Sequence, residues 1–302
     1  MFKYILPFLF VMQKTFGCSV LSFSGGGAYG AFEMGIVSKL FENDHIYDMY
    51  TGVSAGSLNA AFMSTINKGD EKNNIDTYKK LWLQFKNSDI YSYELFANGL
   101  SIYGTKPLSN TLSKIFDDKK PIRPIMVSAT SLTNGTSQIF TNEDINIHGF
   151  KDILMSSTAI PIAFPPHQFL NDYFVDGGLT SNIVLDEGIS YCLKNYPYNK
   201  VIVDVIVSGK KLDRKEIIKL NIFNLLDRLI SIIKQQIEYS ELLQNITNLR
   251  ERIIINIYEQ KQDSRISMLD FTKTEELWDQ GYTMSNVNVR YDILNNNEEF
   301  IY

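Results

Sequence analysis

Residues 19–30 read SVLSFSGGGAYG, and this stretch decides the fold class. Its first part, residues 19–23, is a short apolar run that ends at a glycine cluster, which is typical of a buried strand. Residues 28–41 follow with apolar side chains at helical spacing. A buried strand that turns through glycines directly into a helix indicates an α/β protein with a mostly parallel sheet.

The rest of the chain continues this alternation of strands and helices. Further strands are expected at residues 47–53, 125–130, 136–140, 201–207 and 253–258, and further helices at residues 57–66, 78–85, 222–246 and 275–282. Residues 201–207 (VIVDVIV) are apolar along almost their whole length, as in a parallel sheet that is covered on both faces. Asn134-Gly135 between two expected strands indicates a hairpin. The predicted fold is a three-layer α/β/α sandwich with a mostly parallel central sheet.

The first 17 residues, MFKYILPFLFVMQKTFG, differ from the rest of the chain. They contain a lysine near the start, then an apolar run, and they end on small residues. This pattern predicts either a secretory signal peptide that is cleaved after Gly17 or an apolar N-terminal arm that packs on the fold. The apolar run is too short to span a bilayer. No proline-rich linker or repeat interrupts residues 18–302, so we predict one domain there.

Composition argues against several classes of protein. The chain has 302 residues, of which 44% are hydrophobic and 21% charged, so it can bury a core without disulfides or a metal. Its net charge is −5 and it has no dense stripe of lysine and arginine, which argues against a nucleic-acid partner. Two cysteines, Cys18 and Cys192, cannot make a disulfide framework, and if the N-terminal segment is an apolar arm, Cys18 is expected to be an ordinary buried residue.

The glycine loop Gly25–Gly30 (GGGAYG) allows two interpretations. It fits the G-x-G-x-x-G pattern of a dinucleotide-binding turn, and Asp48 lies at the distance along the chain expected of a ribose ligand. Alternatively, the N–H groups of adjacent glycines and the positive end of the next helix converge on one point, where they can hold an oxyanion.

A second motif, GVSAG at residues 52–56, favours the oxyanion interpretation. It is a G-x-S-x-G sequence between an expected strand and an expected helix, which is the context of a nucleophile elbow. There Ser54 occupies a tight, strained turn, and Gly52 and Gly56 avoid the contacts that a Cβ would make. A dinucleotide fold would instead end its second strand on the acidic ribose ligand. The motif therefore predicts a serine nucleophile.

The base that activates Ser54 is not expected to be a histidine. None of the three histidines has the chain order that a Ser–Asp/Glu–His triad requires. They are His45, His148 and His167. Asp176 ends a short apolar run and is followed by Gly177 and Gly178, so its side chain is expected to point into a site while the backbone turns away. We predict that Asp176 is the base.

Taken together, these motifs resemble the patatin-like phospholipases. The glycine loop, the serine turn and Asp176-Gly177-Gly178 have the order and spacing of that family. Residues 155–166 (MSSTAIPIAFPP), Asn182 and residues 269–282 (LDFTKTEELWDQGY) are similar to it as well. The resemblance covers residues 19 to about 285, which is nearly the whole chain.

The resemblance implies one catalytic domain over residues 18–302 with a Ser–Asp dyad. Ser54 would be the nucleophile and Asp176 the proton acceptor. Oxyanion donors would be Gly25, Gly26 and Gly27, with Gly30, Gly52, Gly56, Gly177 and Gly178 completing the motifs. The resemblance further implies hydrolysis of ester bonds in phospholipids or other acyl lipids at a membrane surface, with no metal, cofactor or nucleic acid. Two alternatives stay open, namely a catalytically weak lipid-binding relative and a dinucleotide-binding oxidoreductase.

Some features fit the resemblance less directly. Tyr29 stands where the family usually has Arg or Lys, so the resemblance does not predict that this protein prefers anionic head groups. Ile183-Val184 replace a proline that the family usually has after Asn182. Residues 91–103 (YSYELFANGLSIY) are rich in aromatic side chains and are predicted to be either a lip that touches lipid or a buried connection. Asn134-Gly135-Thr136 and Asn245-Ile246-Thr247 are glycosylation sequons, which matter if the chain is secreted.

Overall fold

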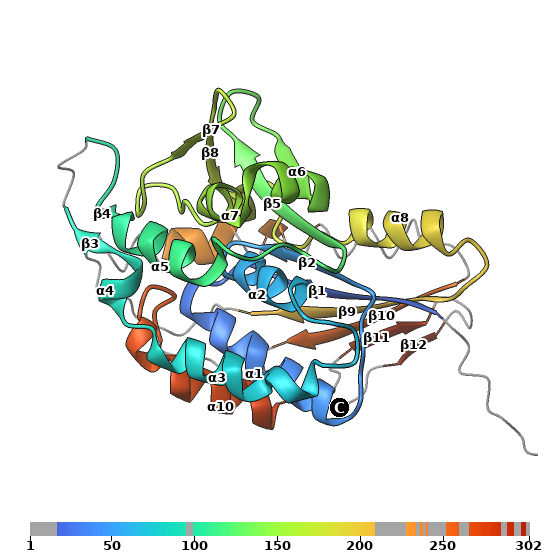
Figure 1. The fold of residues 1–302 in the computed structure, drawn as a ribbon. Helices are drawn as coiled ribbons and strands as arrows, with labels where there is room; N and C mark the ends of the chain where they lie inside the picture. Colours follow the sequence, from blue (N-terminus) through green and yellow to red (C-terminus); the bar gives the residue numbers. More distant parts are fainter. Residues whose placement is uncertain are drawn as a thin grey trace, which may run out of the picture.

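The computed structural model describes residues 17–94, 99–208, 228–233, 236–237, 240, 252–259, 266–284, 289–292 and 297–299 (Figure 1). The expected signal peptide or arm, the sequon at Asn245 and most of the helix expected at residues 222–246 lie outside these residues. Within them, residues 228–233 are helical. No helix of the described part is long and apolar enough to cross a membrane.

A ten-stranded mixed sheet forms the centre of the fold. Its path is β12-β11-β10-β9-β1-β2-β5-β8-β7, with β6 paired to β5. The strands are β1 (Cys18–Phe23), β2 (Met49–Val53), β5 (Ile125–Ser131), β6 (Ser137–Thr141), β7 (His167–Phe169), β8 (Asp172–Asp176), β9 (Val201–Val207), β10 (Ile253–Glu259), β11 (Val289–Asp292) and β12 (Asn297–Glu299). The five central strands β10, β9, β1, β2 and β5 are parallel, and the strands at both ends of the path are antiparallel. The short strands β3 (Ser92–Tyr93) and β4 (Tyr103–Gly104) pair separately.

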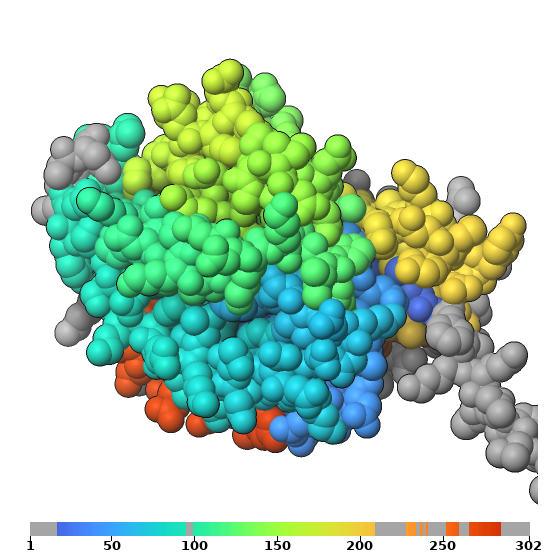
Figure 2. All heavy atoms as spheres, in the orientation of Figure 1, coloured from blue at the N-terminus to red at the C-terminus, as the bar shows by residue number. Residues whose placement is uncertain are grey.

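Helices cover both faces of this sheet, as the three-layer prediction requires. They are α1 (Gly30–Glu42), α2 (Ala55–Ser64), α3 (Ile75–Gln84), α4 (Asn87–Ile90), α5 (Lys106–Phe116), α6 (Asn142–His148), α7 (Phe150–Ser157), α8 (Asp186–Asn195) and α10 (Thr274–Thr283). α1, α3 and α10 pack together beneath the sheet in Figure 1, whereas α8 lies on its other side, against β1, β2 and β9. The segments from α2 to α7, blue to green, form a continuous surface on the face seen in Figure 2.

The alternating side chains of β1 divide the core in two. Leu21 and Phe23 belong to a large cluster with α1 and α2, whereas Cys18 and Val20 belong to a smaller cluster beneath α8. All four side chains are fully buried. This is why the strand appears in the sequence as a continuous apolar run: both of its faces are covered.

The smaller cluster contains a disulfide that corrects the sequence analysis. Cys18, at the start of β1, is bonded to Cys192, near the end of α8, and both residues are fully buried. Two cysteines make no framework of several bridges, but Cys18 is not an ordinary buried residue. The pairing escaped the sequence analysis because the two positions are 174 residues apart and meet only when α8 packs on β1.

Strand β5 aligns two segments that come from distant parts of the chain. On one side it pairs with β6 over residues 126–130. The first part of its other side pairs with β2, where the last pair is Val53 opposite Ser128. The next part of that side pairs with β8, where the first pair is Asp176 opposite Ala129. Because Ser128 and Ala129 are consecutive, the ends of β2 and β8 meet beside each other. The residue after Val53 is therefore brought next to Asp176.

Candidate active site

Ser54 occupies the turn between β2 and α2 in a strained backbone conformation. Its φ is 52° and its ψ is −126°, outside the regions that non-glycine residues prefer. Its N–H donates to the Oγ of Ser157 at 2.9 Å, and that hydroxyl donates to the carbonyl oxygen of Ser128 at 2.7 Å. Ser54 itself is 5% exposed. Strain of this kind persists where the surroundings hold it, and here α7 and β5 do so through Ser157.

The glycines on either side of this turn are required by close backbone approach. A Cβ on Gly52 would overlap the carbonyl oxygen of Gly56, and a Cβ on Gly56 would overlap that of Ser24. Gly52 therefore lets the start of α2 lie directly against the end of β2, and Gly56 lets it lie directly against the end of β1. This contact brings the serine turn next to the glycine loop, as the G-x-S-x-G motif predicts.

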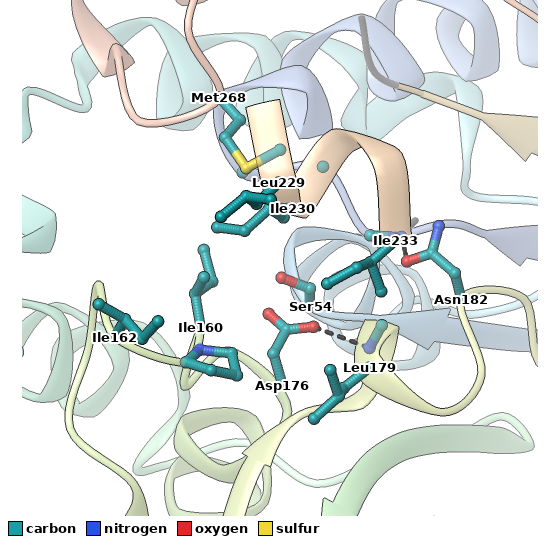
Figure 3. A pocket seen from close by; sticks show the side chains of 15 residues that line it. Ser54, Ile160, Ile162, Asp176, Leu179, Asn182, Leu229, Ile230, Ile233 and Met268 are labelled. Carbon is teal, nitrogen blue, oxygen red and sulfur yellow. Dashed lines mark hydrogen bonds between the residues drawn. The ribbon is translucent and has the colours of Figure 1, made fainter. Parts of the chain in front are cut away.

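Asp176 is the last residue of β8, and its backbone and side chain are both held. Its N–H donates to the carbonyl oxygen of Ala159, and its own carbonyl oxygen accepts from the Thr130 hydroxyl. Its Oδ1 accepts the N–H of Gly178 at 2.9 Å. The side chain is 7% exposed and faces Ser54 across the floor of a cavity (Figure 3). The short 3-10 turn at Gly177–Leu179 thus orients the carboxylate toward the serine.

The glycine loop forms the adjoining wall of the cavity. Gly25, Gly26 and Gly27 all line it, but their N–H groups differ. The N–H of Gly25 donates to the Oδ1 of Asn182 at 3.2 Å, so this group is already occupied. Asn182 is 1% exposed and lies against the loop. The sequence around Asn182 carries no signal that predicts this contact.

The cavity itself is largely apolar. It opens to solvent, and its volume is about 190 Å³. Ser54 and Asp176 lie at its base (Figure 3). Apolar side chains from four separate segments make up the walls: Ile160, Ile162, Leu179, Leu229, Ile233 and Met268. Such a cavity suits a long apolar group whose reactive end reaches the base.

Tyr29 does not reach this cavity. Its side chain is 1% exposed, and its hydroxyl donates to the carbonyl oxygen of Ile266 at 2.8 Å. The ring belongs to the larger core cluster, so the tyrosine that stands in place of Arg or Lys does not present its hydroxyl to the cavity. Its hydrogen bond ties the start of α1 to the segment that precedes α10.

Residues 91–103, predicted to be either a lip that touches lipid or a buried connection, contain both buried and exposed aromatic side chains. Tyr91 and Tyr103 are buried and stack with Phe164, and the Tyr91 hydroxyl donates to Leu269. Tyr93, in contrast, is 75% exposed. Among the described residues of this segment, Tyr91 and Tyr103 therefore belong to a buried connection, whereas Tyr93 and Leu100 lie on the surface.

None of the three histidines lines the cavity. His167 pairs with Asp152 at 3.1 Å, and its burial holds the pKa of its imidazole below the ordinary value. His45 lies 3.7 Å from Asp204. Within the described residues, no group of three His, Cys, Asp or Glu side chains is arranged to hold a metal ion.

Asp48, the residue that supported a dinucleotide site, lies at the wrong edge of the sheet. It precedes β2, whereas the glycine loop follows β1, and these strands are parallel. Its carboxylate accepts the N–H of Ser19 at 3.0 Å and pairs with Lys68. It therefore cannot bind a ribose whose phosphates are at the glycine loop.

A strained serine turn and a glycine loop that follow parallel strands, with an aspartate beside the serine, are typical of α/β proteins with a nucleophile elbow. Within that class, the chain belongs to the patatin-like phospholipase family. The model of that family, described as "Patatin-like phospholipase", matches residues 21–189, which is more than half of the chain.

Curated relatives carry names of lipid hydrolases. A "Probable lipid hydrolase 463L" of Invertebrate iridescent virus 6 is 25% identical over 201 residues, which cover 63% of this chain and 69% of the relative. A "cGAMP-activated phospholipase" of Escherichia coli (strain TW11681) is 26% identical over 195 residues, covering 54% and 52%. "Triacylglycerol lipase 4" of Saccharomyces cerevisiae is 30% identical over 126 residues, covering 38% and 14%. The chain thus spans about half of the second relative and a small part of the third.

A solved structure, that of VipD from Legionella pneumophila, also resembles the chain. The alignment covers 90% of this chain and 66% of VipD at 15% identity, with a TM-score of 0.43. A score of this size supports no conclusion about function.

Proposed function

We propose that this protein is a lipid acyl hydrolase that uses Ser54 and Asp176 as a catalytic dyad. The observation that carries the proposal is the meeting of the strained Ser54 turn and the Asp176 carboxylate at the base of one apolar cavity. A serine alone is a weak nucleophile, and it needs an adjacent base. Asp176 is the titratable side chain among the residues that line this cavity.

The reaction proceeds in two halves through an acyl-enzyme. Asp176 takes the proton of the Ser54 hydroxyl as the oxygen attacks the carbonyl carbon of the ester. The tetrahedral intermediate collapses, and the departing alcohol takes the proton from Asp176. Water then gives a proton to Asp176 and attacks the acyl-enzyme, which releases the fatty acid and returns the proton to Ser54.

The developing negative oxygen is stabilised by backbone N–H groups of the glycine loop. We assign this role to Gly26 and Gly27 and leave out Gly25, whose N–H is bound to Asn182. The N–H of Ser54 is likewise excluded, since it donates to Ser157. One oxyanion donor contributes about 3–4 kcal/mol to transition-state stabilisation in comparable sites.

The substrate is an acyl lipid that the enzyme meets at a membrane surface. Around the mouth of the cavity, four apolar side chains are at least one third exposed, namely Ile162, Leu179, Leu229 and Ile233. Exposed apolar groups around a cavity mark a site for an apolar partner. Contact of this rim with lipid would let an acyl chain enter without crossing water.

An activity-based probe tests the dyad. We expect a fluorophosphonate to label the wild-type protein and not Ser54→Ala, because only an activated serine is phosphonylated. Ser54→Ala removes one hydroxyl and should keep the melting temperature, while it lowers ester hydrolysis by about 10⁴-fold or more. Hydrolysis within tenfold of wild type would remove Ser54 from the mechanism. A lipid panel followed by mass spectrometry would then identify the head group and the acyl position.

A further inference from the structure

One residue at the mouth of the cavity has a conformation that its side chain disfavours. Ile162 has a φ of +70°, and a β-branched residue in this left-handed region is a genuine outlier. Its side chain is also 53% exposed, although it is one of the most apolar. A glycine or an asparagine would adopt this backbone with less strain and would expose less apolar surface.

The other non-glycine residues with positive φ in the described part of the chain have local explanations. Asp44 and Asn171 are of the types that tolerate this region. Ser54 is held in the elbow. Leu170 shares a two-residue hairpin turn with Asn171, in which both residues take positive φ. Ile162 lies in no hairpin, so its strain calls for another cause.

The backbone around Ile162 is fixed without help from its side chain. Its carbonyl oxygen accepts the N–H of Ile102 at 2.9 Å, and the carbonyl of the next residue, Ala163, accepts the N–H of Tyr103. The N–H of Phe164 returns to the carbonyl of Ile160 at 2.8 Å. These bonds use main-chain atoms that any residue at position 162 would supply. They determine the turn, and they leave the choice of side chain to something else.

The side chain of Ile162 faces the place where a substrate must pass. It lines the cavity together with Ile160 on its own loop and Leu229 and Ile233 across the opening. Figure 3 shows Ile162 farther from Ser54 than Ile160 is. A short acyl group at Ser54 would therefore meet Ile160 first, and a longer chain would extend along Ile162.

We infer that Ile162 is a specificity-determining residue that selects long acyl chains. This inference rests on the proposed hydrolase function and goes beyond it, since it assigns chain-length preference to one side chain. Backbone strain is tolerated at functional sites when it places a group that the reaction uses. Here it presents a rigid, branched apolar surface to the distal part of the chain.

The test compares the kcat/KM for p-nitrophenyl palmitate with that for the butyrate ester, both dispersed in the same detergent. In Ile162→Asn and Ile162→Gly the palmitate-to-butyrate ratio should fall roughly tenfold, as when an apolar contact to a substrate is lost. The melting temperature should stay within about 2 °C of wild type or rise, because relief of strain offsets the lost packing. If the Ile162 side chain served the fold alone, its replacement would instead lower the melting temperature and leave the palmitate-to-butyrate ratio unchanged.

Leu170→Gly is the matched control. Leu170 is also left-handed and is 52% exposed, but it lies at the end of β8 that is remote from Asp176. Its replacement should leave the ratio unchanged. If both Ile162 variants keep the wild-type ratio, and the wild-type protein hydrolyses the esters, the inference about Ile162 is wrong and the proposed function stands. Absence of any Ser54-dependent hydrolysis in the wild type overturns both.

Discussion

Where β1, β2 and β5 end, the chain holds Ser54 and Ile162 in strained conformations around an open apolar cavity. Where the same strands begin, it holds a disulfide and a buried ion pair. The disulfide starts at Cys18, the first residue of β1. The ion pair joins Arg123, just before β5, to Glu71, and the same guanidinium donates to the carbonyl oxygen of Tyr47.

The two edges of the same sheet thus serve different purposes. Residues at the carboxyl edge are held in arrangements that cost stability and expose apolar groups. Residues at the amino edge are cross-linked and almost fully buried, with Arg123 at 5% and Glu71 at 2% exposure. We therefore expect changes at the carboxyl edge to alter the rate of hydrolysis, and changes at the amino edge to alter the free energy of unfolding.

The largest effect should come from Asp176→Asn at the carboxyl edge. The amide keeps the shape of the carboxylate but cannot accept the serine proton, so the rate should fall by about 10³–10⁴-fold with little change in melting temperature. The three histidine-to-alanine variants should each keep most of the activity. A folded but inactive His45→Ala, beside an active Asp176→Asn, would contradict both the dyad and the division between the edges.

Breaking the ion pair should give the largest effect at the amino edge. Arg123→Met leaves the Glu71 carboxylate buried without its partner, which typically costs about 3–5 kcal/mol. Urea unfolding should show this loss, while kcat at a temperature where the variant is folded should match wild type. The double variant Arg123→Met/Glu71→Met should recover part of the stability, because no unpaired charge remains. A fall in kcat of the folded single variant would mean that the two edges are coupled.

Removing the disulfide should act in the same direction with a somewhat smaller effect. Replacing Cys18 and Cys192 together by serine should lower the free energy of unfolding by about 2–5 kcal/mol. Hydrolysis by the folded double variant should be unchanged, since neither cysteine lines the cavity. Reduction of the wild-type protein with dithiothreitol under denaturing conditions, followed by alkylation and refolding, should reproduce the loss.

Tyr29 lies at the carboxyl edge of the sheet but does not line the cavity, so we expect its replacement to affect stability and not activity. Tyr29→Phe removes the hydrogen bond to Ile266 and should cost about 1 kcal/mol of stability. The ratio of activities toward anionic and neutral phospholipids should not change. A shifted ratio would mean that the hydroxyl reaches the substrate after all.

Sequence reasoning predicted best the features that depend on a local pattern. The strand at residues 201–207 coincides with β9, and the strand at 19–23 differs from β1 by one residue, because both are largely apolar runs. Helix α8 escaped prediction, since only Gly188, Ile189 and Cys192 of it are buried and its apolar face is short. Helix α5 could have been predicted from the sequence, because its apolar residues Leu108, Leu112 and Phe116 repeat every four residues.

The candidate site divides in the same way. Its motifs were visible because a tight turn needs glycine and a nucleophile needs a particular side chain, so Ser54 and Asp176 could be named as candidates before the structure placed them at one cavity. Contacts between distant segments could not be found. The bond from Ser54 to Ser157 and that from Gly25 to Asn182 join residues 103 and 157 positions apart. Only the pairing of β5 with both β2 and β8 brings such segments together.

The bond between Cys18 and Cys192 also has a topological consequence. It closes a covalent ring of main chain, and both Ser54 and Asp176 lie on that ring. A protease that cuts once within it, for example at the exposed turn around Gly135, opens the ring without dividing the molecule. The nicked protein would run as a single band on a gel without reductant and as two bands with it. One cut therefore leaves both members of the proposed dyad on the same covalent molecule.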